Sequence, residues 1–197
     1  MGNALPQLTL SAEDFLAWEA VQPTRHEFVD GEIFAMAGAE DNHVSVAGNV
    51  YMALRRHLQG TPCRAFMADM RVQVATANSF FYPDVLVTCS DADRTSRLVK
   101  REPKLLVEVL SPSTASYDRG QKFARYRQLD SLLEYVVIDI AQRTADVYRK
   151  GADGLWVLHP FAQGQDVVLG SVDLTISAAD LFADVEDEAP PPEGQAA

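Results

Sequence analysis

Two carboxylates interrupt two apolar segments of the chain, and their positions point to metal chemistry. Asp84 stands in YPDVLV and Glu108 in LLVEVL, each among residues typical of a buried strand. A buried carboxylate is costly unless a cation or hydrogen-bond donors compensate it. If the two strands are antiparallel neighbours, both side chains can bind one hard divalent ion, with the carbonyl of Val109 as a third oxygen ligand. The pattern indicates Mg²⁺, for which Mn²⁺ can substitute.

A lysine further along the chain is a second candidate for this site. Lys122 shares a predicted helix face with Tyr126 and Leu129, so that face should turn toward the sheet. A lysine there can hold a nucleophilic water or stabilise the charge of a phosphate. The alternative is structural, with the two carboxylates neutralised by Arg71 or by the basic residues of this helix, or with Lys122 snorkelling to solvent.

The net charge of −11 argues against a surface covered in basic residues for nucleic acid. The basic residues are nevertheless unevenly distributed, because nine of the 17 Lys and Arg residues fall between positions 94 and 127. Such a local field suits an anionic substrate approaching one face, although a solvated basic loop and helix would give the same pattern. Arg97, Arg101 and Arg119 belong to this group and would line the approach.

The elements that must position these residues follow from apolar periodicity and turn signals. They predict an α/β (α+β) fold whose core runs helix, strand, strand, strand, helix, strand, as a mixed sheet flanked by helices. Residues 1–185 would form one domain, with 186–197 as a disordered acidic tail rich in proline. The expected elements are helices at 12–20, 41–58 and 117–129, a hairpin at 26–36, core strands at 63–74, 80–89, 104–111 and 134–140, a polar, exposed and mobile connection at 90–102, and short C-terminal strands from 144 onward.

The composition favours a soluble, cytoplasmic protein. The chain has 197 residues, 47% of them apolar, and no stretch approaches the ~20 apolar residues of a membrane span. The first ten residues lack the charged-then-apolar pattern of a signal peptide. Cys63 and Cys89 lie far apart without metal-ligand spacing, so they are expected to be reduced, buried small residues.

Asp84, the block Glu108-Val109-Leu110 and the order of the elements together resemble the PD-(D/E)XK nuclease superfamily, which has the restriction-endonuclease-like fold. Residues from about 10 to 185 are similar to the Uma-two (Uma2) family of endonucleases. The segments that carry this likeness are HEFVDGEIFAMAG, NHVSVAGNVYMALRRHL, DMRVQV, YPDVLV, LLVEVLSPSTASYDRGQKFARYRQL and EYVVIDI.

The resemblance implies a Mg²⁺-dependent endonuclease with duplex DNA as its default substrate. The superfamily pattern places its catalytic lysine at position 110, which is leucine here. In the Uma-two block the lysine lies on the following helix, which makes Lys122 the equivalent residue. The resemblance also adds Glu27, on the hairpin, as a further acid whose alternative role is a surface cross-strand contact.

Two residues would support this site. Tyr126 would lie beside Lys122, and His43 could orient a water or a phosphate, although a core histidine with a satisfied hydrogen bond explains it as well. Two other functions stay open.

Leu110 and the negative net charge favour a catalytically silent binding domain with the nuclease fold. The other is a phosphodiesterase acting on a small nucleotide, which the acidic surface would not hinder. A second copy of the chain is the other candidate partner.

Overall fold

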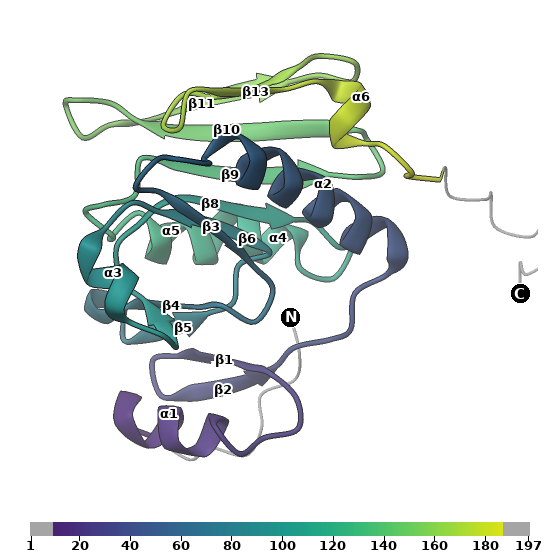
Figure 1. Cartoon of the computed structure of the whole chain (residues 1–197). Helices are drawn as coiled ribbons and strands as arrows, with labels where there is room; N and C mark the ends of the chain where they lie inside the picture. The colour runs from purple at the N-terminus through teal and green to yellow at the C-terminus, as the bar shows by residue number, and fades with distance from the viewer. Residues whose placement is uncertain (1–9, 187–197) are drawn as a thin grey trace, which may run out of the picture.

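The computed structural model describes residues 10–186, so the predicted tail lies outside the described residues apart from Glu186. Two mixed sheets and one small antiparallel sheet form the β structure (Figure 1). In the larger sheet the strand order is β11-β10-β9-β8-β6-β3; β8 and β9 are parallel and the other neighbours antiparallel. Its strands are β3 (Arg64–Met67), β6 (Val85–Thr88), β8 (Pro103–Val109), β9 (Glu134–Asp139), β10 (Thr144–Lys150) and β11 (Trp156–Phe161).

The second sheet has five strands in the order β2-β1-β5-β4-β7. Its hairpin turns at Asp30 and Gly31, whose φ angles of 50° and 96° match the two-residue turn that the sequence predicted. The strands are β1 (His26–Val29), β2 (Glu32–Ala35), β4 (Arg71–Val74), β5 (Ser79–Phe81) and β7 (Val99–Lys100), and the small third sheet pairs β12 (Val167–Leu169) with β13 (Leu174–Ile176).

The helices lie against the faces of these sheets, and α1 and α6 lie at opposite ends of the molecule (Figure 1). A capping box at Ser11 starts α1, because its hydroxyl accepts from the backbone N–H of Asp14. The helical segments are α1 (Ala12–Glu19), α2 (Asp41–His57), α3 (Asp91–Thr95), α4 (Ala115–Tyr117), the π-helical turn η2 (Asp118–Lys122), α5 (Phe123–Tyr126), α6 (Ala178–Leu181) and the 3₁₀ turn η1 (Ala75–Ala77).

Alternation along β8 divides the core between the two faces of the larger sheet. Leu105 and Val107 belong to an apolar cluster with Leu54 of α2, whereas Leu106 belongs to a second cluster with Tyr126 of α5. That second cluster also contains residues of the five-stranded sheet, so both sheets share a core with the α4–η2–α5 helix. The predicted core order of helix, strands, helix and strand is present in α2, β3, β6, β8, α4–α5 and β9.

Two predicted strands are each divided between the sheets, which corrects the expected single strands. The segment 63–74 turns at Ala68, where φ is 53°, and so leaves β3 for β4 of the other sheet. The segment 80–89 breaks at Pro83, which has no N–H for a ladder, and passes from β5 to β6. Apolar alternation continues across the break at Ala68, and the segment around Pro83 is apolar on both sides, which is why the sequence pattern did not reveal the breaks.

The connection 90–102 is mostly exposed, as the sequence predicted, but it also contains regular structure and a buried carboxylate, and its expected mobility stays a prediction. It contains α3 and β7, and the carboxylate of Asp93 is buried beneath them. That carboxylate accepts hydrogen bonds from the Thr88 hydroxyl at 2.9 Å and from the backbone N–H groups of Arg101 and Glu102 at 2.8 and 3.0 Å. The buried carboxylate therefore links α3 to the end of β6 and to the start of β8.

The expectation of two reduced cysteines was wrong, because Cys63 and Cys89 form a disulfide. Strands β3 and β6 pair with Arg64 opposite Thr88, so the next residues outward, Cys63 and Cys89, are also opposite each other. Their separation of 26 residues in sequence hides this proximity. Among residues 10–186, no helix combines the length and apolar character needed to cross a membrane.

Candidate active site

Glu108 points away from α2, into the side of the sheet covered by the α4–η2–α5 helix. Its neighbours Val107 and Val109 face α2, and alternation along β8 turns Glu108 to the opposite face. The side chain is only 4% exposed. Its Oε1 accepts a hydrogen bond from the hydroxyl of Tyr126 at 2.9 Å and lies 3.0 Å from Lys122 Nζ.

Lys122 lies at the centre of the site and is itself buried, with 6% of its surface exposed. Its Nζ lies 3.0 Å from Glu27 Oε1, 3.0 Å from Glu108 Oε1 and 3.3 Å from Asp118 Oδ1. These carboxylates come from three elements: β1 of one sheet, β8 of the other, and η2 between them. Glu27 is therefore directed into the site and does not make a surface contact.

The helix that carries Lys122 is not a regular α-helix. Helical residues run from Ala115 to Tyr126, and a π-helical turn from Asp118 to Lys122 interrupts the α geometry. Asp118 and Lys122 are four residues apart and form an ion pair, and Tyr126 follows four residues later and reaches Glu108. Single π-helical turns within helices are found frequently at functional sites.

Asp84 lies opposite Glu108 where the two strands leave the sheet. Val85 pairs with Val107, so one further step along this antiparallel ladder brings Asp84 level with Glu108. Asp84 Oδ2 accepts from the backbone N–H of Val109 at 2.7 Å. The two strands are thus antiparallel neighbours, as the sequence predicted.

His43 contacts Asp84 from the first turn of α2. Its Nε2 lies 2.9 Å from Asp84 Oδ1. Burial disfavours the imidazolium, but the hydrogen bond and the charge of Asp84 outweigh burial, with smaller contributions from Asp118 and Glu40, and raise the pKa of His43. The histidine is thus satisfied, as a core histidine would be, but its partner is one of the two predicted metal ligands.

The site holds more negative than positive charge. Burial raises the pKa of Glu108 well above its usual range; Lys122 opposes this shift, while Asp118, Asp84 and Glu27 add to it. Burial acts in the opposite direction on Lys122, yet the surrounding carboxylates raise the pKa of its ammonium well above the usual range. The carboxylates thus stabilise the cation that the site already contains, the Lys122 ammonium.

Asp118 is a residue of this site that sequence reasoning did not select. It is buried, its Oδ1 makes the ion pair with Lys122, and the hydroxyl of Tyr135 donates to its backbone carbonyl at 3.0 Å. Its spacing of four residues before Lys122 was the available signal, because residues i and i+4 of a helix lie on one face.

Arg101, one residue of the predicted basic approach, points away from this site. Its Nε donates to Gln73 Oε1 at 2.8 Å, and Gln73 pairs with Phe80 of β5. The Phe80 ring packs against Phe15 of α1, so Arg101 is held on the face of the five-stranded sheet opposite to the site. Arg97 is exposed in the segment between α3 and β7. Strand alternation thus carries Arg101 away from the site, which corrects its expected role, whereas the role of Arg97 in the approach stays a prediction.

Arg119 is closer to the site in sequence but is engaged by carboxylates of the larger sheet. Its Nη2 lies 3.4 Å from Asp139 Oδ2 and its Nε lies 3.6 Å from Asp146 Oδ2. About a third of the side chain is exposed, so an anionic ligand would compete with two carboxylates for this guanidinium. Its predicted role in the approach of a nucleic acid stays a prediction.

The oxygen atoms of Asp84, Glu108 and Val109 are donors of the kind that Mg²⁺ binds, but they do not by themselves form a complete coordination shell. Mg²⁺ is commonly held by one or two carboxylates, with water completing the shell, and Asp84, Glu108 and the Val109 carbonyl fit that donor chemistry. Across residues 10–186 there is no group of three or more His, Cys, Asp or Glu side chains arranged to hold a metal ion. Three carboxylates converge on Lys122 instead.

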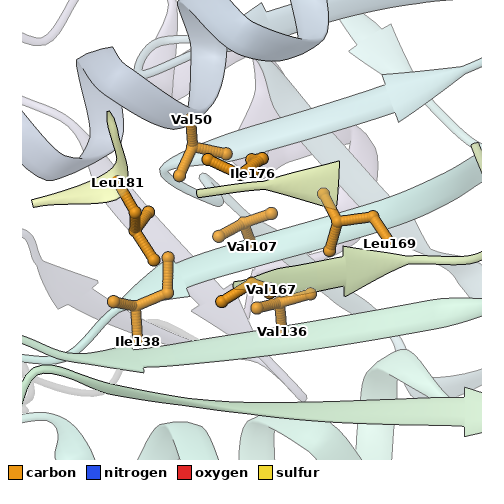
Figure 2. A pocket seen from close by; sticks show the side chains of 8 residues that line it. All are labelled: Val50, Val107, Val136, Ile138, Val167, Leu169, Ile176 and Leu181. Atoms are coloured by element: carbon orange, nitrogen blue, oxygen red, sulfur yellow. The ribbon is translucent and has the colours of Figure 1, made fainter. Parts of the chain in front are cut away.

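A small cavity elsewhere in the fold is entirely apolar and has no role in this chemistry. Figure 2 shows its lining side chains, which come from α2, β8, β9, β12, β13 and the C-terminal α6. Val107 reaches it from the α2 side of the sheet, whereas the neighbouring Glu108 points to the other side. The lining residues are Val50, Val107, Val136, Ile138, Val167, Leu169, Ile176 and Leu181.

Together, the mixed sheets and the carboxylates gathered around one lysine define a class of α/β protein with a buried acidic site at the end of its central strands. The same fold is found in the crystal structure of a "putative nuclease belonging to DUF820" from Anabaena variabilis. The match has a TM-score of 0.71 at 19% identity and covers 88% of this chain and 97% of that one.

A family model described as "Uma2: Putative restriction endonuclease" matches residues 12–180, and the chain belongs to this family. Two uncharacterized proteins of Synechocystis sp. are similar to it. One is 36% identical over 173 residues, covering 88% of this chain and 91% of the relative. The other is 36% identical over 151 residues, covering 76% and 85%. The resemblance to the Uma-two family seen in the sequence is thereby confirmed.

Proposed function

We propose that this chain is a Mg²⁺-dependent endonuclease that hydrolyses phosphodiester bonds in DNA. The observation that carries the proposal is the three carboxylates around the buried Lys122, next to Asp84 and the Val109 carbonyl. Such a site favours an added divalent cation, and the family description names a nuclease activity. The PD-(D/E)XK assignment belongs to the same proposal.

Each residue has a distinct role in this proposal. Asp84, Glu108 and the Val109 carbonyl would hold the ion, which when bound lowers the pKa of water and offsets charge on the phosphate. Lys122 would donate hydrogen bonds that place the attacking water or a phosphate oxygen. Glu27 would orient the Lys122 ammonium from the opposite sheet.

Two further contacts fix the orientation of these groups. The Tyr126 hydroxyl holds Glu108 Oε1, which limits the rotation of that carboxylate. His43 holds Asp84 Oδ1 and, in its protonated form, would add positive charge close to the scissile phosphate. In the reaction, a P–O bond forms to the water oxygen, the P–O bond to the leaving oxygen breaks, and that oxygen takes up a proton.

Nicking of supercoiled plasmid in Mg²⁺ or Mn²⁺ tests the proposal, with EDTA as the metal-free control. We expect metal-dependent nicking by the wild-type protein and none by Asp84→Ala, which should still bind DNA because it removes a negative charge near the phosphate. Equal nicking by the two proteins would assign the activity to a contaminant. Absence of nicking by the wild type on duplex and single-stranded DNA, with both metals, would refute the proposal.

One observation favours a second candidate, a catalytically silent domain that binds nucleic acid. Lys122 already pairs with Glu27, Glu108 and Asp118, as expected of a purely structural counter-ion, and Leu110 stands where the superfamily has its lysine. This candidate predicts retention of DNA in a gel-shift assay by the wild type and Asp84→Ala alike, with no nicking by either protein.

A further inference from the structure

A buried carboxylate outside the site connects two of the segments that form it. Glu19, the last residue of α1, is 0% exposed. Its Oε1 accepts from the backbone N–H of His26 at 3.0 Å and from the Tyr82 hydroxyl at 2.8 Å. Its Oε2 lies 2.9 Å from His26 Nδ1. Both oxygens of one carboxylate are therefore engaged by two separate segments of the chain.

Each of these partners is next to a residue of the candidate site. His26 immediately precedes Glu27 in β1, and alternation points His26 toward α1 while Glu27 points to Lys122. Tyr82 precedes Pro83 and Asp84, and the ring of Pro83 restricts the backbone between them. A shift of His26 or Tyr82 would thus be transmitted over one or two residues to a carboxylate of the site.

The surroundings of Glu19 leave it little freedom to move. The Trp18 ring packs edge-on against the His26 ring with centroids 4.7 Å apart, and the Arg71 guanidinium lies over the Tyr82 ring at 5.4 Å. A fully buried carboxylate that lost its donors would be strongly destabilised, so its three contacts with His26 and Tyr82 hold as a unit.

We propose that Glu19 is a positioning residue that sets the placement of Glu27 and Asp84 relative to each other. This inference rests on the proposed function, since it assumes that the Asp84 carboxylate binds a metal ion. Glu19 does not touch the site; it acts through His26 on one side and through Tyr82 on the other. Residues that orient metal ligands from outside the coordination shell typically change metal affinity about 10–100-fold when they are replaced.

Glu134 provides a matched control elsewhere in the chain. It is also a fully buried carboxylate, and it accepts from the backbone N–H groups of Gly170 and Ser171 at 2.9 and 2.8 Å and pairs with Arg149. Its contacts fasten the segment after β12 to the larger sheet, at the end of β9 remote from the site. Glu134→Gln therefore reports what loss of a buried carboxylate does to the fold alone.

The experiment compares Mn²⁺ dissociation constants, by titration calorimetry, of the wild type, Glu19→Gln, Tyr82→Phe and Glu134→Gln, at a temperature where circular dichroism shows all four folded. We expect about tenfold weaker Mn²⁺ binding in Glu19→Gln and a weakening in the same direction in Tyr82→Phe, which leaves the carboxylate intact. Glu134→Gln should lose thermal stability with less than about a twofold change in Mn²⁺ affinity.

The outcomes separate this inference from the proposed function. If the wild type binds no Mn²⁺, the proposed function fails. If the wild type binds Mn²⁺ and both Glu19→Gln and Tyr82→Phe bind it equally well, the function stands and the positioning role is overturned. Equal weakening in Glu134→Gln would also overturn it, because the effect would then follow from lost stability. Should Glu19→Gln fail to fold, Tyr82→Phe alone decides.

Discussion

Replacing Lys122 by Met should destabilise the protein more than any conservative change on its surface. Met keeps the length of the side chain and its packing near the Phe81 ring, which the ammonium approaches to 5.8 Å, but removes the charge. Three carboxylate oxygens at 3.0, 3.0 and 3.3 Å would lose their shared cation in a buried place. Removing one partner of a buried ion pair costs about 3–5 kcal/mol, and the three contacts place this case toward the upper end.

Urea unfolding in EDTA, followed by tryptophan fluorescence, measures this loss without a metal to replace the ammonium. Glu108→Gln and the double variant complete a double-mutant cycle. The amide introduced by Glu108→Gln is neutral, so it should relieve much of the repulsion that Lys122→Met creates, and we expect a coupling energy of about 2–3 kcal/mol. A loss below about 1 kcal/mol for Lys122→Met, or strict additivity in the cycle, would refute the view that the buried carboxylates depend on this ammonium.

Three further predictions concern stability. Alkaline titration followed by phenolate absorbance should show delayed ionisation, because burial raises the pKa of Tyr117 to about 12 and raises the pKa of Tyr82, Tyr126, Tyr135 and Tyr148 as well. The stability that these neutral tyrosines contribute is fully present below the unfolded-state pKa near 10, and it is lost as the pH rises through the folded-state pKa values. Tyrosines that ionise at a pH well below that of unfolding would contradict the burial described. Reducing the Cys63–Cys89 bond should lower the free energy of unfolding by about 3.5 kcal/mol, from the entropy of closing a 26-residue loop, and urea unfolding with and without reductant measures this loss. Leu54→Ala, at a fully buried position facing the larger sheet, should lose about 2–5 kcal/mol in the same assay.

Much of the core and part of the site could be predicted from local patterns. Glu108 stands out because an acid in an apolar strand requires a partner, and Lys122 because its helical spacing from Tyr126 fixes its face. The strand pairing that places Asp84 opposite Glu108 was expected for the same reason. In each case the chemistry depends on residues within one element or on two adjacent strands, and periodicity is informative over that range.

What local patterns missed depends on contacts between distant segments. The disulfide arises from the register of β3 with β6, and no spacing of Cys63 and Cys89 reveals that register. The breaks at Ala68 and Pro83 move the chain between sheets, although the apolar pattern continues on both sides of each break. Arg101 was assigned to the site by sequence proximity, but the face of a sheet on which a residue lies is decided by strand pairing.

The ion pairs of Lys122 also determine when during synthesis the site can exist. Glu27 is made 95 residues before Lys122 (122 − 27), and β9, which lies beside the strand of Glu108, follows later still. A chain that has emerged only as far as β6 holds Glu27 and Asp84 without the cation that compensates the cluster. Since domains fold as units during synthesis, the buried acids can assemble only once most of the protein has left the ribosome. A chain truncated before Lys122 would thus lack the cation, and burial of these carboxylates would then be energetically unfavourable.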